Sequence, residues 1–154
     1  MTNQPAVNTA LTLLASTGDA SLATLLADGA PFASLVTFAM LDDGSPVLLL
    51  SRLAQHTDNI RRDPRASLLV STLGQNTGED TQTLARATFT GRLKPVDQVD
   101  MQLDARAAFL ARHPSAETYI DFKDFGFYRL AIDQVHVVEG FGRIARFDAS
   151  ALSA

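Results

Sequence analysis

The sequence predicts a mainly β (α+β) fold in which an antiparallel sheet closes into a small barrel with flanking helices. Short strand-like segments follow one another through strong turn signals, and helical segments are inserted between some of them. The regular strand–helix alternation of doubly wound proteins is missing. The chain has 154 residues, which fits a single domain over 1–154 with a core at about 18–147 and a short N-terminal helix before it.

The first half of the chain predicts a helix, a hairpin, a strand and a second helix. Asn8 is expected to cap the N-terminal helix, which stops before Gly18. "ADGAP" predicts a tight turn between two strands, and "LDDGSP" predicts another turn before the apolar strand "VLLLS". The polar segment "HTDNIRRDPR" predicts a short helix with Thr57 as its N-cap and Pro64 beyond its end.

The second half predicts more strands and one long helix. "ASLLVST" and "LARATFTGRL" read as strands around a polar loop, and "FGFYRLAIDQVHVVEGFGRIARF" reads as two strands or one bent ribbon with a break near Asp133. "SAETYIDFKDF" is expected to contain a short helical turn. The segment "VDQVDMQLDARAAFLARH" predicts an amphipathic helix that ends at His113-Pro114. Its expected buried face comprises Val96, Val99, Leu103, Ala107 and Leu110.

Composition excludes several classes of protein. The net charge of −4 argues against a nucleic-acid partner, because neutralising phosphates requires a clustered basic surface. There is no cysteine, so disulfides and thiolate chemistry are excluded. The longest apolar runs are far shorter than the roughly 20 residues that span a bilayer, and the N-terminus does not resemble a secretory signal. We therefore expect a cytoplasmic protein without a membrane partner.

Few residues form a recognisable catalytic or metal-binding pattern. The three histidines lack the spacing of a metal site, so no metal is predicted, and His136 is interpreted as a satisfied residue of a Val-rich strand. Asp121 and Asp124 could act as an acid–base pair, but a capping or salt-bridging role is the preferred interpretation. "GFGR" lies between strand-like segments, which indicates a strand bend rather than a nucleotide loop.

The polar insert after "VLLLS" is the best candidate for a ligand site. Ser51 ends a buried strand, Arg52 follows it, and His56 and Thr57 lie at the predicted start of a helix. A helix N-terminus offers unpaired backbone donors, and a guanidinium adds a charged fork that suits an anion such as phosphate. The alternative is a helix cap with a solvated polar face, and local physics leaves both interpretations open.

The order of several motifs resembles a known family. These motifs are "SRLAQHTDN" with "RDPRASLL", then "HPSA", and finally "DFGFYRL" with "VEGFGR". In this order they resemble the pyridoxamine 5′-phosphate oxidase-like FMN-binding split-barrel proteins, in particular the haem-utilisation branch, over about residues 18–147. The resemblance implies a Greek-key split barrel that forms a homodimer with FMN at the interface.

The resemblance also implies which residues hold the cofactor. The strand along the flavin ring matches Ser34, Leu35, Val36 and Thr37. The phosphate-binding positions match Ser51, Arg52, His56, Thr57 and Asn59. Arg86 occupies the place of a polar residue near the ring or ribityl chain, and Arg143 is expected to face the cofactor from the partner chain.

Departures from the family pattern leave the activity open. Ser34 stands where the pyridoxamine oxidases carry an arginine, and no histidine follows His136, although haem-degrading members use one in a C-terminal extension. The resemblance implies an FMN-dependent oxidoreductase of unknown substrate, with no catalytic side chain assigned. The alternative is a non-catalytic flavin or haem binding or delivery protein, and a third hypothesis is a dimer module that has lost its cofactor.

Overall fold

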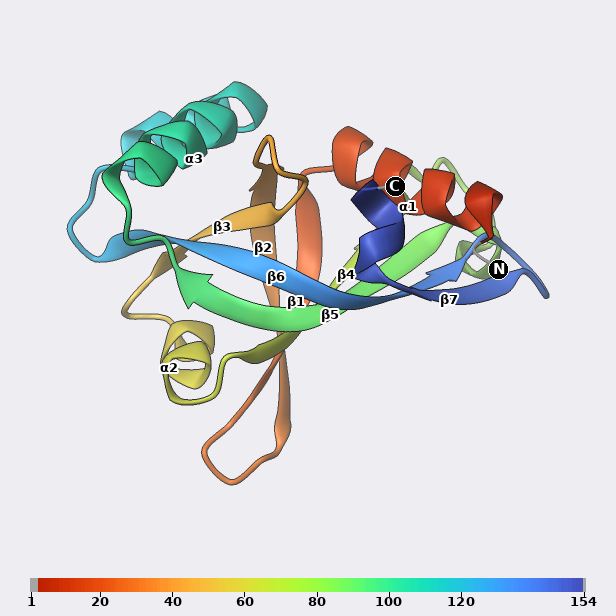
Figure 1. Ribbon diagram of the computed structural model, residues 1–154, viewed down its shortest axis with the longest axis horizontal. Helices are drawn as coiled ribbons and strands as arrows, with labels where there is room; N and C mark the ends of the chain where they lie inside the picture. Colours follow the sequence, from red (N-terminus) through yellow and green to blue (C-terminus); the bar gives the residue numbers. More distant parts are fainter. Residues whose placement is uncertain (1–2, 154) are drawn as a thin grey trace.

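The computed structural model describes residues 3–153, in which seven strands form one antiparallel sheet that closes on itself (Figure 1). The predicted fold class, a split β-barrel with flanking helices, is confirmed. No helix within this range is long and apolar enough to cross a membrane. The strands are β1 (Asp19–Leu25), β2 (Pro31–Met40), β3 (Pro46–Ser51), β4 (Arg65–Ser71), β5 (Arg86–Pro95), β6 (Phe125–Val138) and β7 (Ile144–Asp148). The α-helices are α1 (Gln4–Ser16), α2 (Gln55–Arg62) and α3 (Val99–Arg112).

Strand β6 closes the barrel. The strand order is β3-β2-β1-β4-β5-β6-β7, and an additional pairing joins β3 to β6. The first part of β6 pairs with β3, from Phe125 to Arg129, while its last part pairs with β7. Strand β5 pairs with β6 from end to end. Six strands therefore form the barrel, and β7 extends the sheet beyond it (Figure 1).

A bulge bends β6 where the sequence predicted a break. Thr90 of β5 pairs with Gln134 and Gly91 pairs with Ile132, so Asp133 has no partner in the register. A Cβ atom on Gly91 would lie 1.9 Å from the backbone oxygen of Ala131, so only glycine allows the strands to approach this closely. The segment is thus one bent strand, and the bulge increases its curvature.

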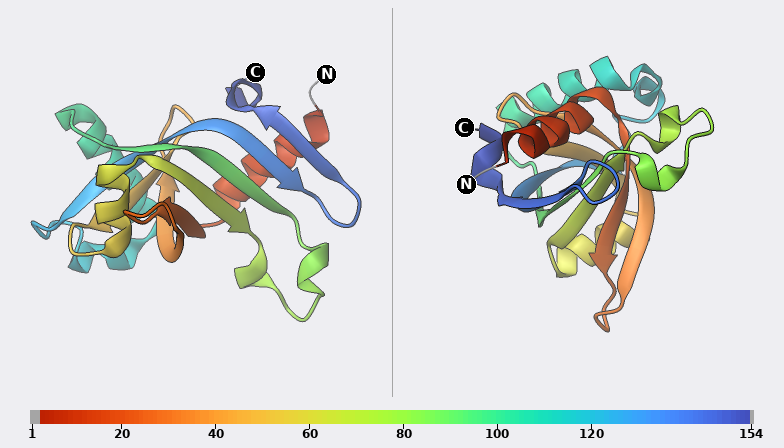
Figure 2. Two further views of the ribbon diagram at one scale, coloured as in Figure 1. Left: turned by 90° about the horizontal axis from the view of Figure 1, so that it is seen from below. Right: turned by 90° about the vertical axis from the view of Figure 1, so that its right-hand side faces the viewer.

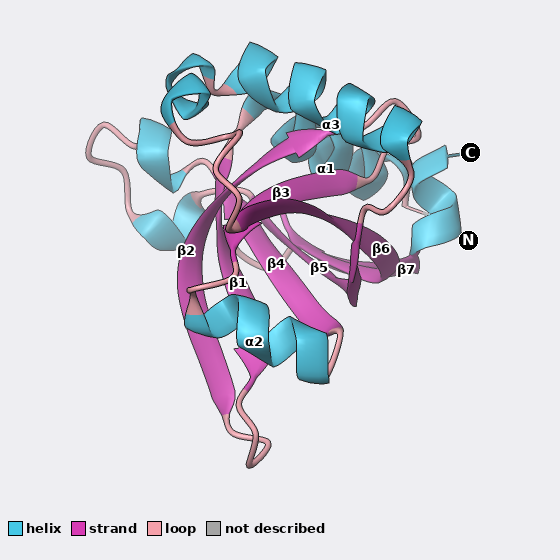
Figure 3. Ribbon diagram, turned by 90° about the vertical axis from the view of Figure 1, so that its left-hand side faces the viewer, coloured by secondary structure: helices cyan, strands magenta, loops and turns pink. Residues whose placement is uncertain are grey.

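The core fills the barrel and extends under two helices. Helix α1 adds Leu14 to the cluster and α2 adds Ile60, and the two helices lie on opposite sides of the barrel (Figures 1 and 3). These contacts explain why two short helices are stable, because most helical stability in proteins comes from packing. The largest fully buried barrel residues are Phe38, Phe89, Leu22, Leu48, Leu68 and Leu130.

Helix α3 covers the outside of β2 and β3, but not through the predicted face. Val99 and Leu103 are 67% and 61% exposed, whereas Ala105 and Phe109 are fully buried. Of the predicted face, Val96 is buried just before the helix, Ala107 is exposed and Leu110 is partly buried. The helix carries two apolar stripes, and the small Ala105 beside the Phe109 ring suits close packing on the sheet. Sequence periodicity does not distinguish between two such stripes.

Two predicted helix starts are wrong. Helix α1 is capped by Asn3, whose Oδ1 accepts a hydrogen bond from the backbone N–H of Ala6 at 3.2 Å, so Asn8 lies inside the helix. Helix α2 begins after Ala54, and Thr57 lies in its first turn. The Thr57 hydroxyl donates to the backbone oxygen of Ser51 at 2.5 Å, which secures the preceding connection instead of capping the helix.

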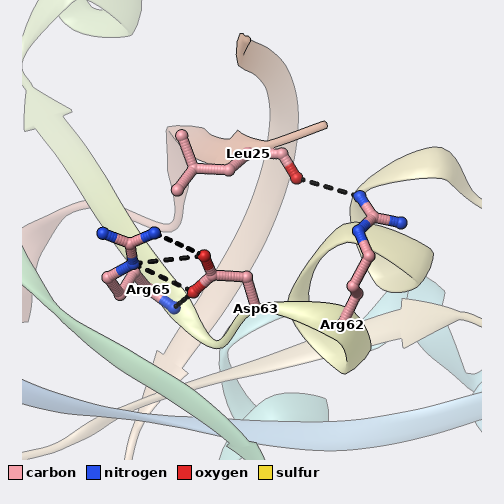
Figure 4. A network of polar contacts seen from close by, with 4 residues as sticks. All are labelled: Leu25, Arg62, Asp63 and Arg65. Atoms are coloured by element: carbon pink, nitrogen blue, oxygen red, sulfur yellow. Dashed lines mark hydrogen bonds and ion pairs between the residues drawn. The ribbon is translucent and has the colours of Figure 1, made fainter. Parts of the chain in front are cut away.

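The end of α2 is fixed to the barrel by arginines (Figure 4). Arg62 donates to the backbone oxygen of Leu25 in β1 at 3.2 Å. Asp63 pairs with Arg65 at 2.6 Å, and this hydrogen-bonded guanidinium lowers the pKa of Asp63 to about 2. The pair orders the turn from α2 into β4.

The two stripes of α3 give a direct test of its orientation. We expect Phe109→Ala to lower the free energy of unfolding by about 3–5 kcal/mol, because it leaves a cavity in a closed core. Leu103→Ala should change it by no more than about 0.5 kcal/mol, because that side chain is already exposed. Urea denaturation of both variants measures the difference, and equal losses would contradict this orientation of α3.

Candidate functional site

One broad face of the sheet is left without a helix. On the outer side of β1, β2 and β4–β7, side chains directly opposite one another form a row across the strands. Two leucines in it are exposed, Leu35 at 79% and Leu69 at 43%, which is unusual for a sheet that meets only water. Across the sheet, the row comprises Leu35, Ser21, Leu69, Thr88, His136 and Arg146.

A cavity of about 460 Å³ lies over this face. The segment 72–85 forms one wall, and Figure 2 shows it projecting from the same end of the molecule as the β6–β7 hairpin. An adjoining cavity of about 230 Å³ shares Leu69 and reaches Leu35, so the two form one groove, which we call the outer-face groove. Four apolar side chains line the larger cavity, namely Leu69, Leu73, Leu84 and Val138, together with six polar residues, Ser71, Thr81, Gln82, Arg86, Thr88 and His136.

Arg86, one of the predicted cofactor residues, lies in this groove and holds its wall. Its Nη1 donates to the backbone oxygens of Gln82 at 3.0 Å and Leu84 at 3.2 Å. The turn itself is capped by Asp80, whose carboxylate accepts from the backbone N–H of Gln82 at 3.0 Å. Arg86 therefore fixes the segment that closes the groove and places positive charge at its edge.

His136 and Arg146 are the two basic side chains of the row, and the sequence assigned neither of them to a site. They lie directly opposite each other on β6 and β7. Neither side chain has a hydrogen bond or an ion pair to another residue in the range 3–153, and both reach the surface. The alternation of buried and exposed residues in β6 would have placed His136 outside the barrel, but not beside a cavity.

Three predicted phosphate residues are already engaged with the protein itself. The Ser51 hydroxyl donates to Asp124 at 2.6 Å and accepts from the backbone N–H of Leu53 at 3.1 Å. Arg52 donates to the backbone oxygen of Lys123 at 2.9 Å. Thr57 is fully buried under its bond to Ser51. These contacts join the end of β3 to α2 and to the loop before β6, which favours the structural interpretation of the insert.

The remaining residues of the insert face β1 and β2. The Ser34 hydroxyl and Nδ1 of His56 are 3.0 Å apart, and burial lowers the pKa of the His56 imidazole. Asn59 is fully buried and donates to the hydroxyl of Thr24 at 3.0 Å. His56 is thus a neutral, partly buried hydrogen-bonding group at neutral pH.

The four predicted flavin-ring positions do not share a surface. Leu35 points outward with the row, while Val36 is buried in the barrel core on the opposite side of β2. Ser34 lies on the same side as Val36, and Thr37 is opposite Asp19 at the end of β1. Of the predicted cofactor residues, only Leu35 and Arg86 line the outer-face groove.

Arg143 lies in the turn between β6 and β7. Its Nη2 donates to the backbone oxygen of Glu139 within the same turn, at 3.3 Å, and it does not line the groove. The turn contains Gly140 and Gly142 at positive φ values of 143° and 75°. This confirms that "GFGR" forms a bend.

The carboxylates of the "DFKDF" segment have structural partners. Asp121 forms an ion pair with Arg106 at 2.8 Å, and that guanidinium lowers the pKa of Asp121. Asp124 accepts the hydrogen bond from Ser51. The salt-bridging interpretation is therefore confirmed for Asp121, whereas Asp124 is held by a hydrogen bond from a hydroxyl group. Within residues 3–153 there is no cluster of three or more His, Asp or Glu side chains arranged to hold a metal ion.

The buried imidazole predicts a pH dependence of stability. Burial lowers the pKa of His56 from its ordinary value of 6.5, so the unfolded chain binds the proton more readily than the folded one. The free energy of unfolding should fall as the pH drops below about 6.5, and His56→Gln should reduce that fall. Urea denaturation between pH 8 and 5 measures both, and identical pH profiles would contradict the assignment.

Comparison with known proteins identifies the family. The family model described as "CREG, beta-barrel" matches residues 1–152. The non-canonical heme oxygenase HOZ of Arabidopsis thaliana, a chloroplastic protein, is 40% identical over 113 residues, which are 73% of this chain and 33% of that protein. The chain thus spans about a third of that curated relative.

Solved structures agree with this assignment. A heme binding protein from Mycobacterium smegmatis is 35% identical, with a TM-score of 0.89 over 99% of this chain and 62% of that one. Campylobacter jejuni ChuZ, at 16% identity and a TM-score of 0.85 over 98% of this chain and 62% of that one, shares the fold. With a barrel of the same topology and a family match over almost its whole length, this chain belongs to the CREG β-barrel family.

Proposed function

We propose that this protein binds haem in the outer-face groove. The observation that carries the proposal is a cavity that combines leucine and valine walls with a single imidazole, that of His136. Its leucine and valine walls suit a porphyrin, because cofactor sites are mostly apolar with a few placed polar groups. When bound, haem supplies redox and oxygen chemistry, and the protein supplies binding, orientation and shielding from water.

The dimensions and charges of the groove fit such a ligand. The larger cavity, at about 460 Å³, lies within the roughly 300–1,000 Å³ of small-molecule sites. Arg86 lines it, and the exposed Arg146 lies directly opposite the lining residue His136 on the neighbouring strand. Haem carries two carboxylates, so guanidinium groups at the edge of an apolar site are the complement it needs.

The relatives support the same ligand. The Mycobacterium smegmatis protein, 35% identical to this chain, is described as heme binding, and the Arabidopsis relative is named a non-canonical heme oxygenase. Since the chain covers only 62% and 33% of their lengths, haem binding is the part of those descriptions that we propose for it.

FMN is the second candidate, and one observation favours it. The N-cap residue of α2 is Ala54, which has no side chain that could cap the helix, so the first backbone N–H groups of α2 are available to an anion. His56, in the first turn of this helix, is hydrogen-bonded to Ser34 of β2. An FMN-dependent oxidoreductase would place the phosphate here, although Ser51 and Thr57 already bond to the protein.

We also propose that a second copy of the chain covers the outer face. Leu35, Leu73, Phe141 and Ile144 are 79%, 56%, 73% and 62% exposed, and such surfaces mark interaction sites. A homodimer joined through this face would enclose the groove on its open side.

Absorbance spectra of the purified protein distinguish the two ligands. Titration with ferric haem should produce a shifted, saturable Soret band, because the ligand moves from water into an apolar, ligating site. Titration with FMN should leave the flavin spectrum unchanged. No saturable haem band would overturn the main proposal, and a flavin shift abolished by His56→Gln would support the second candidate.

The proposed dimer predicts that Leu35→Asp gives a monomer. A charge at the centre of an apolar interface loses its water without gaining a partner, which destabilises the assembly. Sedimentation velocity should show a dimer for the wild-type chain and half that mass for the variant. Leu103→Asp, on the exposed stripe of α3, is the matched control and should remain dimeric. A monomeric wild-type chain would contradict the proposal.

A further inference from the structure

The geometry points to His136 as the side chain that ligates the haem iron, with Arg146 pairing with a haem carboxylate. This inference rests on the proposed haem function and assigns the residues that perform it. The sequence interpretation placed neither residue in a site, and the structure sets Arg146 directly opposite His136, which lines the outer-face groove.

His136 is the histidine that remains free to ligate. Nε2 of His113 is 2.8 Å from the backbone oxygen of Phe38, and its ring packs on Phe109 at 4.8 Å between centroids. His56 lies in the first turn of α2, is paired with Ser34, and does not line the groove. The imidazole of His136 has no such partner among residues 3–153, and it lines the cavity.

Other haem ligands are absent from the groove. The chain has no cysteine, and the lining residues of the cavity include no methionine, tyrosine or lysine. Haem iron is held in proteins by histidine, thiolate, methionine or tyrosine side chains. His136 is therefore the one side chain in this lining with the required chemistry, and a neutral imidazole nitrogen is the form that binds metals.

The position of Arg146 suits a carboxylate at the rim. It is the residue directly opposite His136 on β7, so its guanidinium lies within side-chain reach of a ligand bound to that imidazole. It has no carboxylate partner among residues 3–153, unlike Arg65, Arg106 and Arg129, each of which pairs with an aspartate. The guanidinium of Arg86, by contrast, already donates hydrogen bonds to the groove wall.

The test compares haem complexes of three variants of the full chain with the wild type. In resonance Raman spectra of the ferrous complex, the wild type should show an iron–imidazole stretching band. His136→Ala should lose that band, and added imidazole should restore it. Arg146→Ala should keep the band but bind haem roughly tenfold more weakly, the effect of losing a charge-assisted hydrogen bond. Gln134→Ala, on the same face of β6 but outside the cavity lining, is the control and should match the wild type.

The outcomes separate this inference from the proposed function. Thermal unfolding without haem establishes that each variant folds. If the wild type binds haem and His136→Ala keeps the same band and affinity, the assignment of His136 is overturned while haem binding stands. A wild-type complex without an iron–imidazole band overturns the assignment as well. If the wild type does not bind haem, the proposed function and this inference fail together.

Discussion

The whole structure depends on the bend in β6 that closes the barrel. One strand pairs with β3 in its first part, with β7 in its last part, and with β5 from Tyr128 to Val138. A flat strand could not serve both neighbours, and the bulge at Asp133 opposite Gly91 supplies the curvature. The missing side chain of Gly91 matters because a Cβ atom would collide with the backbone of Ala131. Without this approach, the sheet would lose its closure and the enclosed core.

Closure decides where the helices go and which surface is left for function. Helices α1 and α2 complete the barrel core through Leu14 and Ile60, and α3 covers β2 and β3 with a second cluster around Phe109. Among residues 3–153, the segment 72–85 forms one wall of the cavity on the outer face of the remaining strands. A ligand site that needs apolar walls and an open approach can form there, at the junction of that segment with the exposed strand surface.

Polar residues serve two different purposes in this protein. In the insert, the side chains of Ser51, Thr57 and Asn59 form hydrogen bonds within the protein. The bonds of Thr57 and Asn59 join α2 to β3 and β1. On the outer face, His136 and Arg146 stand in register without partners in the described range. Buried polar groups must be paired to avoid a free-energy cost, whereas exposed ones remain free to meet a ligand. The polar insert, which carries more polar side chains, therefore has the structural role.

The sequence by itself determined the strands, the turns, the short helix of the insert and the barrel class, because these follow from local alternation and turn chemistry. It also located the bend near Asp133 and the structural roles of Asp121 and Asp124. Only the tertiary structure decided which stripe of α3 is buried, and which polar side chains form hydrogen bonds within the protein. It also brought His136, Arg86 and Leu35 to one groove from three different strands. The physical reason is that local patterns fix which way a side chain points along its own strand, whereas a site depends on register between strands far apart in the chain.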